Sequence, residues 1–168
     1  MEKHKAIILG LQCSGKTTLK RYLESKFDLP LLEDDELFTE LNDGEYPSDT
    51  EYKEKTLRPM LNEKIKSSDN IVFLTTYIEK SLLKELKEKD FKVIQINLER
   101  DEFNRRNIKR MKEEGYDDAN QEWTDDIFKY HKEVRDEGLV DKVIEADKPV
   151  EEIADELVSF LSNQTGSS

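Results

Sequence analysis

The chain has 168 residues, and its 27 basic and 39 acidic side chains give it a formal net charge of −12. This length suits a single domain with its own hydrophobic core, and so acidic a surface argues against polynucleotides as partners. One cysteine, no leader-like N-terminus and no long apolar run predict a cytoplasmic protein that neither enters a membrane nor depends on disulfides. With only two histidines beside that cysteine, a protein zinc site is not expected.

Strands and helices are expected to alternate along the whole chain, which predicts an α/β fold with a mainly parallel sheet. The expected strands are residues 4–9, 29–32, 70–75, 91–97 and 142–145. The expected helices are residues 16–27, 50–66, 79–89, 101–113, 121–136 and 149–162. Pro59 is expected to kink or break the second of these helices. Residues 1–162 then form one domain, and residues 163–168 form a flexible tail.

The first strand and the first helix enclose the segment Gly10–Thr17, which fits the phosphate-binding pattern G-x-x-x-x-G-K-[ST]. Its glycines allow the backbone to approach a phosphate closely, and the N-terminus of the following helix favours an anion. Lys16 is expected to reach the β- and γ-phosphates of ATP, and Thr17 is expected to bind Mg²⁺ through its hydroxyl. The residues expected to bind the nucleotide here are Gly10, Leu11, Gln12, Cys13, Ser14, Gly15, Lys16, Thr17 and Thr18.

An acidic segment, Glu33-Asp34-Asp35-Glu36, follows the second strand. Because the carboxyl ends of parallel strands meet at one edge of a sheet, these carboxylates should lie near the phosphate loop. If the chain stays extended here, Glu33 and Asp35 point to one side and Asp34 to the other. One of that pair could hold Mg²⁺ through water, and the other could accept the proton of a hydroxyl. The alternative is an acidic helix start, with Asp34 or Asp35 as the N-cap.

With these motifs the chain resembles the small P-loop kinases related to shikimate kinase and gluconate kinase. The resemblance implies a three-layer α/β/α fold with a five-stranded parallel sheet in the order 2-3-1-4-5 and a helical lid. It also implies an acidic pair after the second strand, which Glu33 and Asp35 match at 17 and 19 positions beyond Lys16. In such a site Glu33 would join Thr17 at Mg²⁺, and Asp35 would act on the acceptor hydroxyl.

The acceptor motifs of those kinases are not reproduced in this chain. Thr75-Thr76-Tyr77 occupies the position of three glycines in shikimate kinases, and Lys53 and Arg58 are the nearest candidates for an arginine of gluconate kinases. We expect the acceptor to be a small molecule. The residues expected to contact it are Glu33, Asp35, Arg58 and Thr76.

Several arginines follow the fourth strand, and the related kinases carry a similar pattern in a lid that closes over the phosphates. Arg106 and Arg110 lie on one helix face and are expected to stabilise the transferring phosphoryl group, within a lid of about residues 105–120. The alternative is a solvated basic face that pairs with nearby acids such as Glu102. The resemblance also implies that the loop after the last strand borders the adenine. Its residues are Asp147, Lys148 and Pro149.

The predicted activity is ATP- and Mg²⁺-dependent transfer of a phosphoryl group to a hydroxyl of a sugar- or polyol-type metabolite, by a monomer or a homodimer. The segment 106–118 also resembles adenylate kinase-like proteins and dephospho-coenzyme A kinases, so the alternative acceptor is a nucleoside monophosphate or a ribose hydroxyl. A phosphate acceptor needs cations, for which Lys53, Arg58 and Arg135 are available, instead of a general base. A third alternative is a nucleotide-binding regulatory module without turnover. A GTPase is not expected, because the chain has no N-K-x-D motif.

Overall fold

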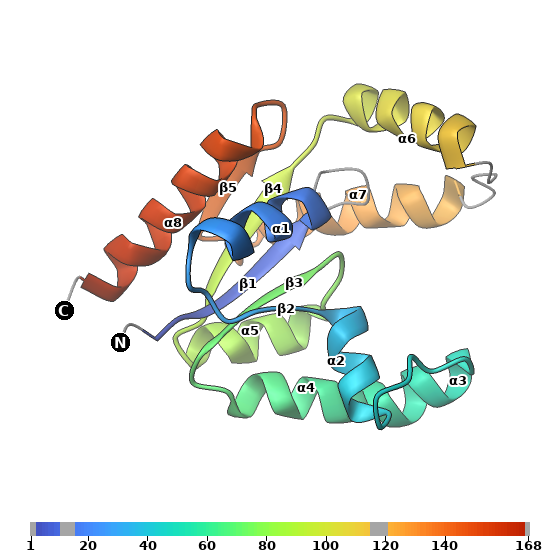
Figure 1. Ribbon diagram of the computed structural model, residues 1–168, viewed down its shortest axis with the longest axis vertical. Coiled ribbons are helices and arrows are strands. Elements are labelled where there is room, and N and C mark those ends of the chain that lie inside the picture. Colours follow the sequence, from blue (N-terminus) through green and yellow to red (C-terminus); the bar gives the residue numbers. More distant parts are fainter. Residues whose placement is uncertain (1–2, 11–15, 115–120, 167–168) are drawn as a thin grey trace.

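The computed structural model describes residues 3–10, 16–114 and 121–166, which form a three-layer α/β/α structure (Figure 1). Its strands are β1 (Lys5–Gly10), β2 (Leu31–Glu33), β3 (Ile71–Thr75), β4 (Lys92–Asn97) and β5 (Lys142–Glu145). Its helices are α1 (Lys16–Lys26), α2 (Asp34–Leu41), α3 (Thr50–Tyr52), the π-helical segment η1 (Lys53–Leu57), α4 (Arg58–Ser67), α5 (Lys80–Glu88), α6 (Arg100–Glu114), α7 (Gln121–Asp136) and α8 (Val150–Gly166). Within the described ranges, no helix is both long enough and apolar enough to cross a bilayer.

The five strands form one parallel sheet in the order β2-β3-β1-β4-β5, which confirms the predicted topology. Strand β1 is central, and it pairs with β3 on one side and with β4 on the other. Because each connection between parallel strands returns through a helix, the carboxyl ends of all five strands lie along one edge. This edge is where the sequence predicts the nucleotide and acceptor sites.

The central strands are buried on both faces, which explains why their sequences are continuous apolar runs. In β1, Ala6 and Ile8 face a core that includes residues of α1 and α8, whereas Ile7 and Leu9 face a core that includes residues of α2, α4 and α5. All four of these residues are 0% exposed. The helices therefore cover the sheet completely at its centre, and the site-bearing ends of the strands are rigidly supported.

Helix α2 is where the structure departs most from the predicted elements, and it follows the acidic-helix alternative. The acids Asp34–Glu36 form its first turn, where the partial positive charge of the helix N-terminus stabilises them. The N-cap is Glu33 and not Asp34 or Asp35, as that alternative expects, and its backbone N–H donates to Glu36 Oε1 at 3.1 Å as part of a capping box. Leu37 and Phe38 are buried and anchor the helix. The chain is thus helical, and no longer extended, from Asp34 onward.

The predicted helix 50–66 is continuous but changes its winding in the middle, from α3 through η1 to α4. In η1 the N–H of Arg58 donates to the carbonyl of Lys53, five residues back. Pro59 follows directly, and it has no N–H with which to continue the regular pattern. The wider turn lies next to the predicted kink at Pro59. It carries Lys53 and Glu54, which line the cavity described below.

The last helix, α8, is predicted to be amphipathic, and this is confirmed because its apolar residues Ile153, Ala154, Leu157 and Leu161 are all buried. They belong to the core that also contains residues of α1. The backbone of α8 continues to Gly166, four residues beyond the predicted end of this helix. Extension beyond an anchored turn needs no new helix nucleus, which accounts for the additional helical residues.

Helix α7 contacts the loop between β3 and α5 through the polar groups of Tyr130 and His131. The Tyr130 hydroxyl accepts a hydrogen bond of 3.2 Å from the Ile78 N–H and donates to the Ile78 carbonyl. His131 Nε2 lies 2.9 Å from the carbonyl oxygen of Thr76. The helical spacing of Ile127, Tyr130 and Val134 predicts that Tyr130 packs in the core, and its 7% exposure confirms this. A surface position is the expectation for His131, and it is wrong because His131 is 2% exposed. A carbonyl at the end of the strand gives the imidazole a polar contact and so permits its burial.

We expect Tyr130→Phe to lower the free energy of unfolding by about 1–3 kcal/mol, because both backbone groups of Ile78 lose their partner in a buried place. Urea denaturation followed by circular dichroism measures this change. Tyr52→Phe is the matched control, since Tyr52 is 43% exposed, and it should unfold like the wild type. The role assigned to the hydroxyl is contradicted if Tyr130→Phe is as stable as the wild type.

Candidate active site

The phosphate-binding motif lies at the carboxyl edge of the sheet, between the central strand β1 and helix α1. Gly10 ends β1, and Lys16 begins α1. Thr17 and Thr18 follow in the first turn and are exposed, so their hydroxyls can reach a ligand. The predicted contacts of residues 11–15 and of the Lys16 side chain lie outside the described part of the structure. The strand before this motif and the helix after it are where the motif requires them.

The two residues predicted to bind Mg²⁺, Thr17 and Glu33, both lie at this edge. Thr17 is in the first turn of α1, and Glu33 ends β2. Lys20 links the two regions, because its Nζ lies 3.0 Å from Glu36 Oε1 of α2 and 3.2 Å from Glu24 Oε1 of α1. A hydroxyl and a carboxylate are oxygen ligands that Mg²⁺ takes beside the phosphates of a nucleotide, so these residues fit that metal.

Asp34, and not Asp35, is the acidic side chain that contacts the end of β3. Its Oδ2 accepts a hydrogen bond of 3.0 Å from the hydroxyl of Thr75, which is 1% exposed. Asp35 is exposed, and its backbone carbonyl accepts a hydrogen bond of 2.8 Å from Thr39 Oγ1. The predicted alternation, with Glu33 and Asp35 on one side, is wrong because α2 begins at Asp34. Successive residues of a helix diverge by about 100° instead of 180°.

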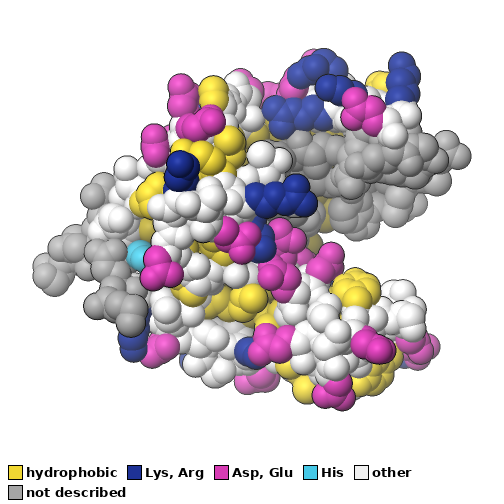
Figure 2. All heavy atoms as spheres, in the orientation of Figure 1, with side chains coloured by type: hydrophobic (Ala, Val, Ile, Leu, Met, Phe, Trp, Pro, Cys, Tyr) yellow, Lys and Arg dark blue, Asp and Glu magenta, His cyan; other side chains and the backbone are white. Residues whose placement is uncertain are grey.

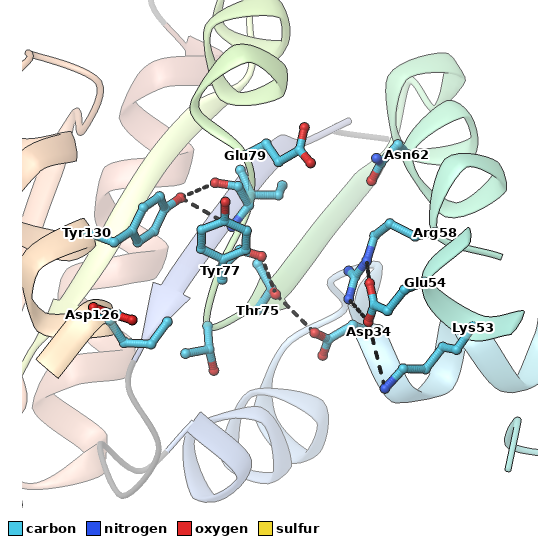
Figure 3. Close-up of a pocket in the computed structure, with 13 residues that line it drawn as sticks. Asp34, Lys53, Glu54, Arg58, Asn62, Thr75, Tyr77, Glu79, Asp126 and Tyr130 are labelled. Carbon is cyan, nitrogen blue, oxygen red and sulfur yellow. Dashed lines mark hydrogen bonds and ion pairs between the residues drawn. The ribbon is translucent and has the colours of Figure 1, made fainter. Parts of the chain in front are cut away.

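A cavity of about 670 Å³ opens beside Asp34 (Figure 3). One of its walls comes from η1 and α4, another comes from α7, and the residues at the end of β3 lie between them. The space-filling view shows the molecule hollowed on this side, next to the region of α2 to α4 (Figure 2). Arg58 and Thr76, two of the predicted acceptor residues, line this cavity, whereas Glu33 and Asp35 do not. The polar side chains in the lining are Asp34, Lys53, Glu54, Arg58, Asn62, Thr75, Thr76, Tyr77, Glu79, Asp126 and Tyr130.

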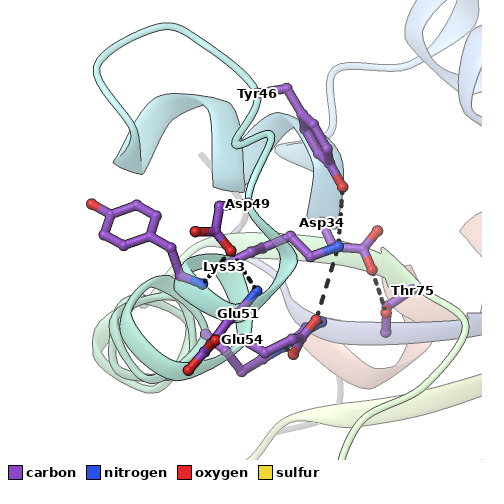
Figure 4. A network of polar contacts seen from close by, with 9 residues as sticks. Asp34, Tyr46, Asp49, Glu51, Lys53, Glu54 and Thr75 are labelled. Carbon is purple, nitrogen blue, oxygen red and sulfur yellow. Dashed lines mark hydrogen bonds and ion pairs between the residues drawn. The ribbon is translucent and has the colours of Figure 1, made fainter.

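Glu54 contacts both positively charged side chains of this cavity. Arg58 donates through Nε to Glu54 Oε2 at 3.1 Å and through Nη2 to Glu54 Oε1 at 3.2 Å. Lys53 Nζ lies 3.9 Å from Glu54 Oε1 and 3.3 Å from the Tyr46 hydroxyl (Figure 4). The hydrogen bonds from Arg58 lower the pKa of Glu54, which keeps this carboxylate ionised at neutral pH. The four-residue spacing of Glu54 and Arg58 is visible in the sequence, but their place in a cavity is not.

The arginine-rich helix α6 meets the loop after β5 at a second hollow, of about 480 Å³. Arg106 donates through Nη2 to the Ala146 carbonyl at 3.2 Å and through Nε to Glu102 Oε1 at 2.8 Å. The structure therefore brings Arg106 beside the loop predicted to border adenine, and it also pairs Arg106 with Glu102, as the solvated-face alternative requires. The residues that line this hollow are Glu102, Arg105, Arg106, Asp147, Lys148 and Pro149.

Arg100 and Arg135 line neither of these two hollows. Arg100 pairs with Asp125 at 2.7 Å, between α6 and α7. Arg135, a predicted candidate for binding a phosphate acceptor, donates to Asn97 Oδ1 at 3.1 Å. The side chain of Arg110 lies outside what the structure describes, so its place in the lid stays a prediction.

No family model matches the chain, and no curated protein matches it in sequence. Solved structures of kinases are nevertheless similar to it over nearly its whole length. A shikimate kinase from Aquifex aeolicus has a TM-score of 0.67 and 19% identity, with 96% of this chain and 99% of that chain covered. The chain has the fold of a P-loop kinase.

Two further structures agree with this fold. A shikimate kinase from Acinetobacter baumannii, solved in complex with shikimate, has a TM-score of 0.69 and 16% identity, with 98% of this chain and 96% of that chain covered. A gluconokinase from Sinorhizobium meliloti has a TM-score of 0.61 and 15% identity, with 96% of this chain and 93% of that chain covered. The likeness confirms the predicted fold class and architecture, and the activity has to be inferred from the site.

Glu102 is expected to remain ionised in acid, because Arg105 and then Arg106 lower its pKa from 4.5 to about 2 through hydrogen bonds. Since the pKa is depressed in the folded state, these bonds contribute stability above pH 4.5, and that contribution is lost as the pH falls toward 2. Carboxyl-carbon NMR of the folded protein measures the pKa directly. Arg105→Ala should raise it toward 4.5, and Lys109→Ala, which removes a cation from the same helix, should leave it low. A wild-type pKa near 4.5 would contradict this pairing.

Proposed function

We propose that this protein is an ATP- and Mg²⁺-dependent kinase that phosphorylates a hydroxyl group of a small metabolite. One observation carries the proposal: the phosphate-binding motif and the polar cavity beside Asp34 share the carboxyl edge of one sheet. Two sites at one edge can hold a nucleotide and an acceptor side by side, which removes much of the entropic barrier to their reaction. The likeness of the fold to shikimate kinases and a gluconokinase supports this assignment.

In this proposal the nucleotide is held at the N-terminus of α1. The loop amides and Lys16 neutralise the β- and γ-phosphates, and Thr17 and Glu33 hold Mg²⁺. A bound Mg²⁺ would offset the charge on the phosphate oxygens during transfer. Since such a reaction needs little covalent chemistry from the protein, catalysis rests on positioning and on electrostatic stabilisation.

The lid side of the nucleotide is assigned to α6. We infer that Arg106 and Arg110 contact the phosphates, and that residues 147–149 border the base. The hollow shared by Arg106 and residues 147–149 supports this arrangement. On nucleotide binding, Arg106 would exchange its contacts with Glu102 and Ala146 for phosphate oxygens, which are strong acceptors for a guanidinium group.

Asp34 is the carboxylate that we assign to the acceptor hydroxyl. It lines the cavity and is held by the buried Thr75 hydroxyl, whereas Asp35, which the sequence pattern favours, is exposed. A carboxylate beside the acceptor can orient the hydroxyl and accept its proton as the new O–P bond forms. The bond between the γ-phosphorus and the bridging oxygen breaks in the same transfer, and ADP leaves.

A hydroxyl acceptor suits this cavity better than a phosphate acceptor. A phosphate would need accessible cations, but Arg58 already donates two hydrogen bonds to Glu54, and Arg135 donates to Gln95 and Asn97. A carboxylate at Asp34 would also repel a phosphate dianion. A nucleoside monophosphate is therefore the less favoured alternative.

We expect acceptor-dependent release of ADP from Mg-ATP when the protein is given a panel of sugars, polyols, nucleosides, nucleoside monophosphates and dephospho-coenzyme A. Lys16→Ala should abolish this release, because the β- and γ-phosphates lose their principal cation. Lys26→Ala is the matched control, since it removes the same charge from the exposed end of α1, and it should retain activity. Normal turnover in Lys16→Ala would refute the phosphate-site assignment, and a silent panel with ATP still bound would favour a regulatory nucleotide-binding module.

Asp34→Asn should lower kcat by roughly 10²–10⁴-fold, because it removes the group that accepts the hydroxyl proton. The substitution keeps an oxygen that can accept from Thr75, so the fold should be preserved. Asp35→Asn is the matched control and should change kcat by less than about threefold, as an exposed surface substitution. A large loss in Asp35→Asn alone would restore the assignment favoured by the sequence, and small losses in both variants would point to a phosphate acceptor.

A further inference from the structure

We propose that the acceptor cavity selects a polyhydroxy compound without a carboxylate or phosphate group, either neutral or bearing an ammonium group, and that Glu54 sets this preference. The inference rests on the proposed function and names the substrate class of the same site. It departs from what the names of the similar structures suggest, because shikimate and gluconate are both acids.

The charged groups of the cavity give it an acidic balance. Four carboxylates line it, from Asp34, Glu54, Glu79 and Asp126, against the two cations Lys53 and Arg58, which is a formal net charge of −2. In the space-filling view, acidic side chains gather at the inner end of the hollow (Figure 2). An anion entering this space meets a like charge close to where it must bind, and like charges disfavour each other most where water is partly excluded.

Both cations already have a polar partner in the cavity wall. A guanidinium group grips a carboxylate best through two parallel hydrogen bonds, and Arg58 already donates through Nε and Nη2 to the two oxygens of Glu54. Lys53 is shared between the Tyr46 hydroxyl and Glu54 (Figure 4). An acidic acceptor would have to displace Glu54 and would then lie beside it.

The opposite side of the cavity offers no compensating cation among the described residues. Glu79, from the loop after β3, and Asp126, from α7, line that side, are both exposed, and make no ion pair with a described side chain. The remaining polar groups are uncharged, and Asn62, Thr76 and Tyr77 supply both donors and acceptors. Hydroxyl groups can use donors and acceptors of this kind, and an ammonium group can use the carboxylates.

The test is a matched series of open-chain acceptors that differ in one terminal group. Glucitol is neutral, 1-amino-1-deoxyglucitol carries an ammonium group, and gluconate carries a carboxylate. With the full chain and Mg-ATP, kcat/KM from ADP release should be at least about tenfold lower for gluconate than for either of the others, as expected for a partly desolvated like charge. If none of the three is a substrate, the test uses the acceptor that the panel reveals. A neutral or cationic acceptor at pH 7 supports the inference, and an anionic acceptor contradicts it.

Glu54→Gln isolates the residue to which we assign the selectivity. It should raise the ratio of kcat/KM for gluconate over glucitol by about fivefold, because Arg58 and Lys53 become available to the carboxylate. Glu51→Gln removes the same charge from the preceding helical turn, where Glu51 pairs with Lys55 at 2.8 Å outside the cavity lining, and it should leave the ratio unchanged. Where another acceptor proves to be the substrate, the ratio compares kcat/KM for its carboxylate analogue with kcat/KM for that acceptor.

The outcomes separate this inference from the function on which it rests. A preference for gluconate, or for any other acid, overturns the inference and leaves the kinase assignment intact. An unchanged ratio in Glu54→Gln overturns the role of Glu54. A panel in which no compound is phosphorylated refutes the kinase function, and the inference falls with it.

Discussion

The burial of β1 on both faces is the constraint on which the rest of this molecule depends. The strand has neighbours on both sides and helical layers above and below, so its end at Gly10 cannot shift without disturbing both cores. A loop that binds phosphate needs such a fixed origin, because backbone N–H groups act on an anion only when they are held in place. The same parallel arrangement brings the ends of β2, β3 and β5 to this edge. The acidic helix, the acceptor cavity and the loop of residues 146–149 follow from that geometry.

The acceptor side depends on a local irregularity of the backbone. Pro59 cannot donate a hydrogen bond, and the helix before it opens into the wider turn of η1. This stretch carries Lys53, Glu54 and Arg58 along one wall of the cavity. Within it, both cations contact the single carboxylate of Glu54. Because Asp34, Glu79 and Asp126 line the same cavity, its formal net charge is −2.

The fold could be predicted almost entirely from the sequence, because its signals are local and repeated. The phosphate-binding motif, the apolar strands and the stripe of α8 each agree with a single parallel architecture, and the resemblance supplies the strand order. The predictions that are wrong concern segments whose sequence suits two local structures equally well. At Glu33–Asp35 the same acids suit an extended pair or a helix start, and the capping of α2 together with the burial of Leu37 and Phe38 favours the helix.

Other features depend on contacts between residues far apart in the chain. His131 is buried because the carbonyl of Thr76 lies beside it, 55 positions earlier in the sequence. The spacing of Glu54 and Arg58 predicts an ion pair, but nothing local shows that this pair faces Glu79 and Asp126 across a cavity. The proposed nucleotide site rests on one contiguous motif that the sequence displays, whereas four separate segments build the cavity proposed for the acceptor.

The anchoring of α7 by Tyr130 and His131 has a consequence for how an acceptor is received. Tyr130 lines the cavity, yet its hydroxyl is fully committed to the backbone of Ile78. This wall is therefore preorganised, and the conformational entropy of fixing it is lost during folding, before any acceptor arrives. Binding then has to order fewer side chains on that side, and more of the contact free energy remains for affinity. In the proposed function, discrimination among acceptors then rests on the charged side chains of the lining, on both sides of the cavity.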